Sequence, residues 1–253
     1  LGDVYKRQVS GHSDHWFFGN GMLHGVYLED GKASYKNRYV RTPYFENDLN
    51  VMSSFGNLAA SPANTHIVNH AGKLLALEET SFPWELNMDL DTIGVEDFEG
   101  KLKTPMTAHP RVCPETGEML FFGYSMMGAP FLNYHRVSKE GKLVQSEAIE
   151  IPRPVMMHDW NITRNYVVFM DLPIVSDMDL AVTTGSPFGF KPECGARLGV
   201  MPREGNNSDV RWFDIDPCFV FHSFNSFEED KKIVLYVSRP VSYTHLTLPT
   251  KNE

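Results

Sequence analysis

Short apolar runs, separated by explicit turns, are the feature that most constrains the fold of this chain. Each run is bounded by charged or glycine-containing turns, which is the pattern of short buried strands. The runs lie at residues 73–77, 118–124, 166–170 and 232–237. A β-hairpin is also predicted over residues 133–151, with a turn at 139–142. With no long amphipathic helix between them, these runs predict an all-β fold: a sandwich, a barrel or a propeller.

The domain boundaries follow from what lies between the runs and at the ends. Only residues 54–60 favour a short helix, and no Pro-, Gly- or Ser-rich linker divides the chain, so we expect one domain. Residues 1–8 and 241–253 resemble adapter DNA translated as protein. We therefore expect these two tails to be foreign to the fold, as a cloning scar would be. The domain is then residues 9–240, cut from a longer chain.

Composition excludes several classes of function. The chain has 253 residues and a net charge of −9, without a run of basic residues interleaved with aromatic ones, so nucleic-acid binding is not expected. No apolar stretch approaches the roughly 20 residues that span a bilayer. The cysteines, Cys113, Cys194 and Cys218, form no CxxC pair, which fits a reducing compartment and predicts a cytoplasmic protein.

Five of the 10 histidines have a context that indicates a surface or structural role. Those beside turns or polar residues are His12, His24, His66, His70 and His135. His245 lies in the suspected tail and is set aside, whereas His15 precedes three aromatic residues and leaves both roles open.

Three histidines remain, His109, His158 and His222, and each accompanies an apolar run. Their separation is too long for a local zinc hairpin but suits ligands delivered singly by successive sheets that converge on one axis. A set of imidazoles without sulfur suits Fe(II), Cu(II) or Zn(II). Spacing alone leaves a purely structural role open for all three.

Six linked motifs resemble those of the carotenoid cleavage oxygenase family, which includes the lignostilbene dioxygenases. They are HWFFGNGMLHG at 15–25, SYKNRYVRT at 34–42, LLALEE at 74–79, TAHP at 107–110 with PETGE at 114–118, PVMMHD at 154–159 and FHSFN at 221–225. They occur in the family's order and spacing, from about His15 to Val237.

The resemblance implies a seven-bladed β-propeller, incomplete in this chain. It also implies an Fe(II) cofactor held by four histidines, of which His109, His158 and His222 match the first three. The fourth ligand lies beyond the end of this chain, which is therefore expected to be inactive by itself. Glu79 matches a carboxylate that hydrogen-bonds a ligand histidine, where it would fix the imidazole tautomer.

Some positions depart from the family pattern, and others allow a second interpretation. Asn20 stands where the family often has Asp, and Glu78 stands where stilbene-cleaving members have a Lys that meets the substrate phenol. Four aromatic residues are candidates for lining an apolar substrate tunnel, and core packing is the alternative for each. They are Phe121, Tyr124, Phe131 and Trp160.

The function implied is that of a non-haem iron dioxygenase. It would cleave a conjugated C=C bond of an apocarotenoid-like or stilbene-like substrate with O₂ and give two carbonyl products. Its partners would be that apolar small molecule, O₂ and, for substrate uptake, a peripheral contact with a membrane. The alternative is a non-redox metal-binding propeller, either lactonase-like or a binding module; a Ca²⁺-dependent lactonase would need oxygen ligands rather than imidazoles.

Overall fold

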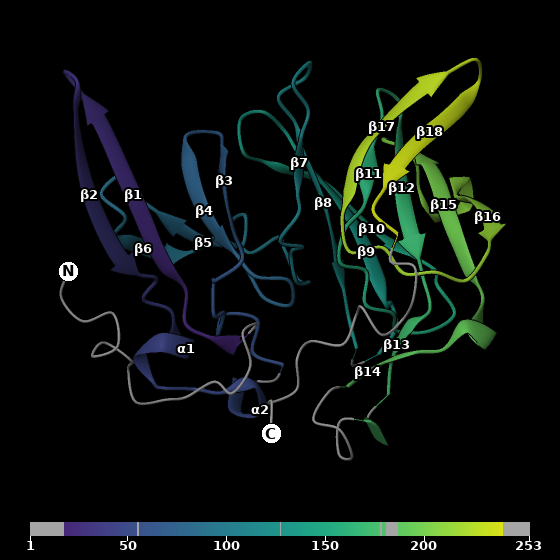
Figure 1. Ribbon diagram of the computed structural model, residues 1–253, viewed down its shortest axis with the longest axis horizontal. Helices are drawn as coiled ribbons and strands as arrows, with labels where there is room; N and C mark the ends of the chain where they lie inside the picture. Colours follow the sequence, from purple (N-terminus) through teal and green to yellow (C-terminus); the bar gives the residue numbers. More distant parts are fainter. Residues whose placement is uncertain (1–17, 55, 127, 178, 181–186, 240–253) are drawn as a thin grey trace. The chain divides into compact units, whose positions relative to one another are not determined.

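The computed structural model describes residues 18–239 except 55, 127, 178 and 181–186, and it consists mainly of antiparallel strands (Figure 1). The first sheet has four antiparallel strands in the order β3-β4-β5-β6. These strands are β3 (His66–His70), β4 (Lys73–Leu77), β5 (Trp84–Leu86) and β6 (Thr92–Val95). A meander of this kind, in which neighbours in sequence pair with each other, is the unit that β-propellers repeat.

Two further four-stranded sheets follow along the chain. One has the order β10-β9-β8-β7, and the other has the order β11-β12-β15-β16. The strands of the former are β7 (Arg111–Val112), β8 (Met119–Tyr124), β9 (Leu132–Val137) and β10 (Leu143–Ile149). Those of the latter are β11 (Asn161–Ile162), β12 (Tyr166–Asp171), β15 (Ala196–Pro202) and β16 (Arg211–Ile215).

Three strand pairs complete the sheets of the described residues. Each is a two-stranded antiparallel sheet. They are β1 (Met22–Glu29) with β2 (Lys32–Tyr39), β13 (Ile174–Ser176) with β14 (Phe188–Phe190), and β17 (Ser223–Glu229) with β18 (Lys232–Val237). Short 3-10 turns at Pro192–Cys194 and Asn207–Asp209 flank β15.

The strands and the hairpin predicted from the apolar runs are confirmed. Residues 73–77, 118–124, 166–170 and 232–237 match β4, β8, β12 and β18 to within one residue, and the hairpin over 133–151 is formed by β9 and β10. The helix predicted at 54–60 is wrong, because the helices are α1 (Pro43–Glu46) and α2 (Val51–Ser54). The Asn50 side chain caps α2 by accepting from the Ser53 amide at 2.9 Å, and Gly56, at φ +79°, adopts a backbone that no right-handed helix contains.

The chain divides into two compact units. The first comprises Leu1–Gly123 with Arg136–Val144, and the second Tyr124–His135 with Gln145–Glu253. One apolar cluster of the first unit includes Leu75, Leu77, Leu102, Met106, Met119 and Phe121. The second unit contains a fully buried aromatic group in which Trp160 lies 5.9 Å from Tyr134 and 6.1 Å from Phe169, between ring centroids.

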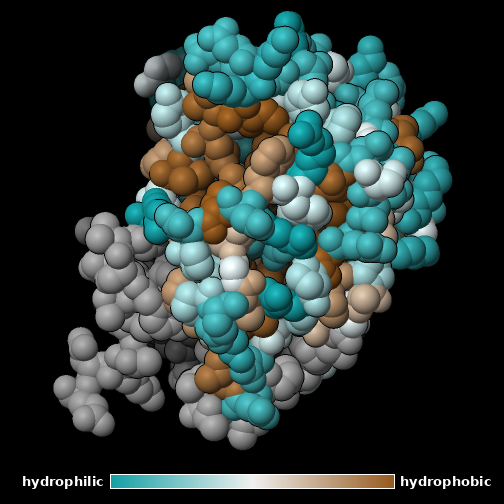
Figure 2. Space-filling view, turned by 90° about the vertical axis from the view of Figure 1, so that its right-hand side faces the viewer, coloured by the Kyte–Doolittle hydropathy of each residue, from teal (hydrophilic) through white to brown (hydrophobic). Residues whose placement is uncertain are grey.

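The surface of the second unit also carries apolar side chains. Phe213 on β16, Phe224 on β17 and Tyr236 on β18 are exposed. Figure 2 shows apolar patches among polar surface on the face that lies to the right in Figure 1. No helix in the described part of the chain is long and apolar enough to cross a membrane. The tails predicted at 1–8 and 241–253 lie outside the described residues.

Candidate metal centre

His158 and His222 face each other in the second unit. Their Nε2 atoms lie 3.2 Å apart, and their rings are 5.0 Å apart between centroids at an angle of 70°. His158 lies in the segment that leads into β11, and His222 comes directly before β17. His158 is half-buried and His222 is exposed, so the pair lies at the margin of the packed core, where an ion can reach it.

The spacing of the pair fits two ligands of one transition-metal ion. Two nitrogens bound at about 2.1 Å are about 3.0 Å apart at a right angle and about 3.4 Å apart at the tetrahedral angle. The observed 3.2 Å falls between these values. Phe221 packs the edge of its ring against His158, 5.2 Å away at 80°, and Phe219 packs in the same way on Phe221. These aromatic contacts restrict the orientation of the His158 ring.

His109 lies in the loop that leads into β7, in the first unit. Its backbone amide donates to the Thr107 hydroxyl at 3.1 Å, and both Thr107 and Ala108 are buried. His66, at the start of β3, stacks beside the His109 ring at 6.2 Å and is hydrogen-bonded through Nδ1 to the Ala108 carbonyl at 2.8 Å. The sequence placed His66 among the structural histidines, and it gave no signal for this packing against His109.

Of the three predicted ligand histidines, His158 and His222 lie together in the second unit, whereas His109 belongs to the first. A metal site shared by all three stays a prediction. Each of the three precedes the first strand of a sheet, namely β7, β11 or β17. The predicted set contains imidazoles alone, a donor set that suits Fe, Zn, Cu or Ni ions.

Glu78 and Glu79 follow β4 and are both half-buried. The Glu78 carboxylate accepts from the Thr80 amide at 2.8 Å and from the Ser81 hydroxyl at 2.9 Å, so it closes its own turn. Burial raises the pKa of Glu78 above its ordinary value, and the nearby Glu79 charge acts in the same direction. The hydrogen bond assigned to Glu79 with a ligand histidine stays a prediction.

The four candidate tunnel residues differ in their surroundings. Phe121 belongs to the core cluster of the first unit, where its ring stacks on Phe98 at 6.0 Å. Trp160 belongs to the buried aromatic group of the second unit. Tyr124 is buried at the end of β8, whereas Phe131 is half-buried. A tunnel role stays a prediction for all four, and Phe131 is the member with the most accessible ring.

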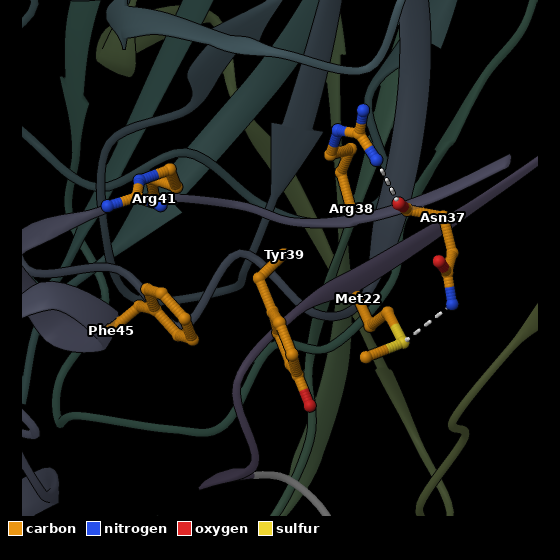
Figure 3. A pocket seen from close by; sticks show the side chains of 6 residues that line it. All are labelled: Met22, Asn37, Arg38, Tyr39, Arg41 and Phe45. Atoms are coloured by element: carbon orange, nitrogen blue, oxygen red, sulfur yellow. Dashed lines mark hydrogen bonds between the residues drawn. The ribbon is translucent and has the colours of Figure 1, made fainter. Parts of the chain in front are cut away.

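A cavity of about 270 Å³ lies in the first unit beside β1, β2 and α1 (Figure 3). Its lining consists of Met22, Asn37, Arg38, Tyr39, Arg41 and Phe45. The Tyr39 and Phe45 rings stack at 4.9 Å, and Arg41 pairs with Glu46 at 2.6 Å. None of the residues predicted for the metal site or the tunnel lines this cavity.

Comparison with known proteins agrees with the arrangement of the sheets. Residues 2–252 match the family described as RPE65, retinal pigment epithelial membrane protein. The chain is 37% identical to carotenoid 9,10(9',10')-cleavage dioxygenase 1 of Arabidopsis thaliana, over 89% of this chain and 48% of that protein. It is 33% identical to isoeugenol monooxygenase of Pseudomonas putida, over 90% of this chain and 52% of that protein.

A solved structure gives the same assignment. The crystal structure of Pseudomonas brassicacearum lignostilbene dioxygenase superposes with a TM-score of 0.77 at 33% identity, over 88% of this chain and 50% of that one. The chain thus spans about half the length of the relatives it matches. This likeness identifies the four-stranded sheets as blades, and the predicted all-β, incomplete β-propeller is confirmed. The chain belongs to the RPE65 family, that of the carotenoid cleavage oxygenases.

Proposed function

We propose that this chain carries the metal-binding part of a dioxygenase that cleaves a conjugated C=C bond. One observation carries the proposal: the Nε2 atoms of His158 and His222 lie 3.2 Å apart in a member of a family whose relatives are named cleavage dioxygenases. The reaction adds both atoms of O₂ to the two carbons of the alkene. The carbon–carbon bond breaks, and each fragment leaves with one carbonyl oxygen.

Fe(II) is the ion that we assign to His109, His158 and His222. Neutral imidazoles leave the full positive charge on the ion, whereas a carboxylate ligand would cancel part of it. When bound, the iron would supply open coordination positions for O₂. The lactonase-like alternative receives no support from these residues, since Ca²⁺ prefers oxygen ligands and all three predicted ligands are imidazoles.

The chain's own residues would hold the ligands and shape the apolar approach to them. Phe221 restrains the His158 ring through its edge contact. We assign Glu79 to a hydrogen bond with a ligand histidine, which would hold the ring in the tautomer that presents a free nitrogen. Phe131 and Tyr124 are the residues that we assign to the tunnel, because Phe121 and Trp160 already fill the cores of their units.

The substrate proposed is an apolar polyene of the apocarotenoid class, with a stilbene as the second choice. Glu78 supports this order, because stilbene-cleaving members carry a Lys at its position. Its carboxylate already accepts hydrogen bonds from its own turn, so it offers no donor to a phenol. For uptake of such a substrate we propose a peripheral contact with a membrane, and the three free cysteines support a cytoplasmic location.

The test combines metal analysis with a cleavage assay. The 253-residue chain and the full-length product of its gene are loaded anaerobically with Fe(II) and desalted, and their iron content is measured. O₂-dependent cleavage of apocarotenal and of resveratrol is then followed by product analysis. We expect iron in both proteins and cleavage by the full-length product. Absence of bound iron from the full-length product, or equal cleavage without iron, would falsify the assignment.

A further inference from the structure

Strands β11 and β17 lie side by side although they belong to different sheets (Figure 1). Side chains rather than a backbone ladder join them. The Ser226 hydroxyl donates to the Ile162 carbonyl at 2.7 Å, and the Ser223 hydroxyl lies 3.2 Å from the Trp160 carbonyl. The two strands begin just after His158 and His222, so whatever aligns the strands also aligns the two histidines.

The strongest of these links is a single buried carboxylate, that of Asp159. Its Oδ1 accepts from the Trp160 amide at 2.8 Å. Its Oδ2 accepts from both the amide and the hydroxyl of Ser223, each at 2.9 Å. Asp159 is 2% exposed, and hydrogen bonds to an ionised acceptor in such an environment are roughly twice as strong as neutral ones.

The chain positions of these partners are what connect them to the metal site. Asp159 is the residue after His158, and Ser223 is the residue after His222. The carboxylate therefore ties together the backbones that carry the two histidines, whose Nε2 atoms lie 3.2 Å apart. Without the link, the position of each histidine would be set by its own sheet alone. Bringing the two rings together would then cost free energy when the ion binds and would weaken the binding.

We propose that Asp159 is a positioning residue that holds His158 and His222 at the separation needed to share one metal ion. This inference rests on the proposed function, since it assumes that the two histidines are ligands. In this role Asp159 acts through the backbone and hydroxyl of Ser223.

A second carboxylate on the same pair of segments provides a matched control. Glu228, farther along β17, accepts from the Thr163 hydroxyl at 2.6 Å and from the amide and side chain of Asn165, each at 2.8 Å. It thus clamps the turn after β11 in the way that Asp159 clamps the segment before it. A role limited to strand pairing predicts the same effect from both carboxylates, whereas a positioning role predicts an effect on metal binding from Asp159 alone.

The experiment titrates Co²⁺ alone into the 253-residue chain and follows the visible absorption of the bound ion and its dissociation constant. The variants are Asp159→Asn, Ser223→Ala, Ser223→Thr and Glu228→Gln, each with its thermal midpoint measured. Asp159→Asn should weaken Co²⁺ binding about 10- to 100-fold, the range for groups that orient metal ligands, and should alter the absorption bands. Ser223→Ala should weaken binding less, because the Ser223 amide still reaches the carboxylate.

Ser223→Ala separates positioning from charge, because it removes a hydrogen bond and leaves the charge near the ion unchanged. Ser223→Thr keeps the hydroxyl and should restore wild-type affinity and absorption. Glu228→Gln should lower the thermal midpoint and leave the affinity as in the wild type.

The outcomes distinguish this inference from the proposed function. If the wild-type chain binds Co²⁺ no better than a His158→Ala variant, the ligand assignment fails and the inference fails with it. If the wild type binds and His158→Ala does not, but Ser223→Ala matches the wild type in affinity and absorption, Asp159 is not a positioning residue. An equal loss of Co²⁺ affinity in Glu228→Gln and Ser223→Ala would also overturn the positioning role of Asp159. These last two criteria hold even if Asp159→Asn does not fold.

Discussion

The Nε2 atoms of His158 and His222 lie 3.2 Å apart although 64 residues separate the two histidines along the chain. Two imidazole nitrogens at this distance can both face a single metal ion. Neutral imidazole is the form that binds a metal ion. The pair is therefore arranged for the coordination chemistry that the family membership implies.

Replacing any one of His109, His158 and His222 with Ala is expected to lower bound iron strongly. The physical reason is that the remaining two ligands leave more of the coordination sphere to water. Combining His158→Ala with His222→Ala should cost less than the sum of the single losses, because residues that share one ion act as a unit. Metal analysis after anaerobic loading measures the iron bound by each variant. His24→Ala is the control, since His24 is exposed and bonds to Tyr35; an equal loss there would contradict the ligand assignment.

Stability should fall as the pH is lowered from about 6.5 to about 4, because of His135. Burial lowers the pKa of His135 to about 4, so the folded state keeps the ring neutral while the unfolded chain takes up a proton first. A shift of this size corresponds to roughly 3 kcal/mol of unfolding free energy, present in full above pH 6.5. Urea unfolding at pH 7 and pH 5 measures the slope. His135→Leu should flatten it, and an unchanged slope in that variant would contradict the assignment.

Gly123→Ala is expected to destabilise the first unit. A Cβ at this position would lie 2.0 Å from the Pro105 carbonyl oxygen, so strand β8 and that loop must separate, at a cost of about 1–3 kcal/mol. Gly94→Ala in β6 is the matched control, because a Cβ there meets nothing within 4 Å. Denaturant midpoints compare the two variants. Equal stability of Gly123→Ala and Gly94→Ala would contradict the close approach.

Trp160→Ala should lower the free energy of unfolding by about 3–5 kcal/mol, as expected for a fully buried aromatic residue. Phe131→Ala should cost much less, since Phe131 is half-buried, and should change the preference of the full-length enzyme among apolar substrates. Unfolding curves and competitive cleavage assays measure the two effects. A small stability loss for Trp160→Ala with a large change of substrate preference would favour a tunnel role for Trp160 over core packing.

The sequence was sufficient for β4, β8, β12, β18 and the β9-β10 hairpin, because a short apolar run between turn residues has few alternatives to a strand. The linked motifs also allowed His109, His158 and His222 to be predicted as ligands, and that assignment stays a prediction. Other features leave no local pattern. The link from Asp159 to Ser223 spans 64 residues and joins two sheets, so neither residue is distinguished by its neighbours. The contact of His66 with His109 likewise joins residues that are far apart in the sequence. The helix predicted at 54–60 was misplaced because the Asn50 side chain caps a helix that starts earlier.

Glu78→Lys is expected to raise cleavage of resveratrol relative to apocarotenal in the full-length protein. Glu78 now accepts hydrogen bonds from Thr80 and Ser81, and a lysine can replace none of them, so its ammonium would be free to meet a phenol oxygen. The lost bonds should lower the free energy of unfolding by about 1–3 kcal/mol. Product ratios from mixed substrates measure the preference. Glu78→Gln is the control, because it keeps the shape of the side chain without a cation and should leave the ratio unchanged. A folded Glu78→Lys variant with the wild-type ratio would show that this position does not select the substrate.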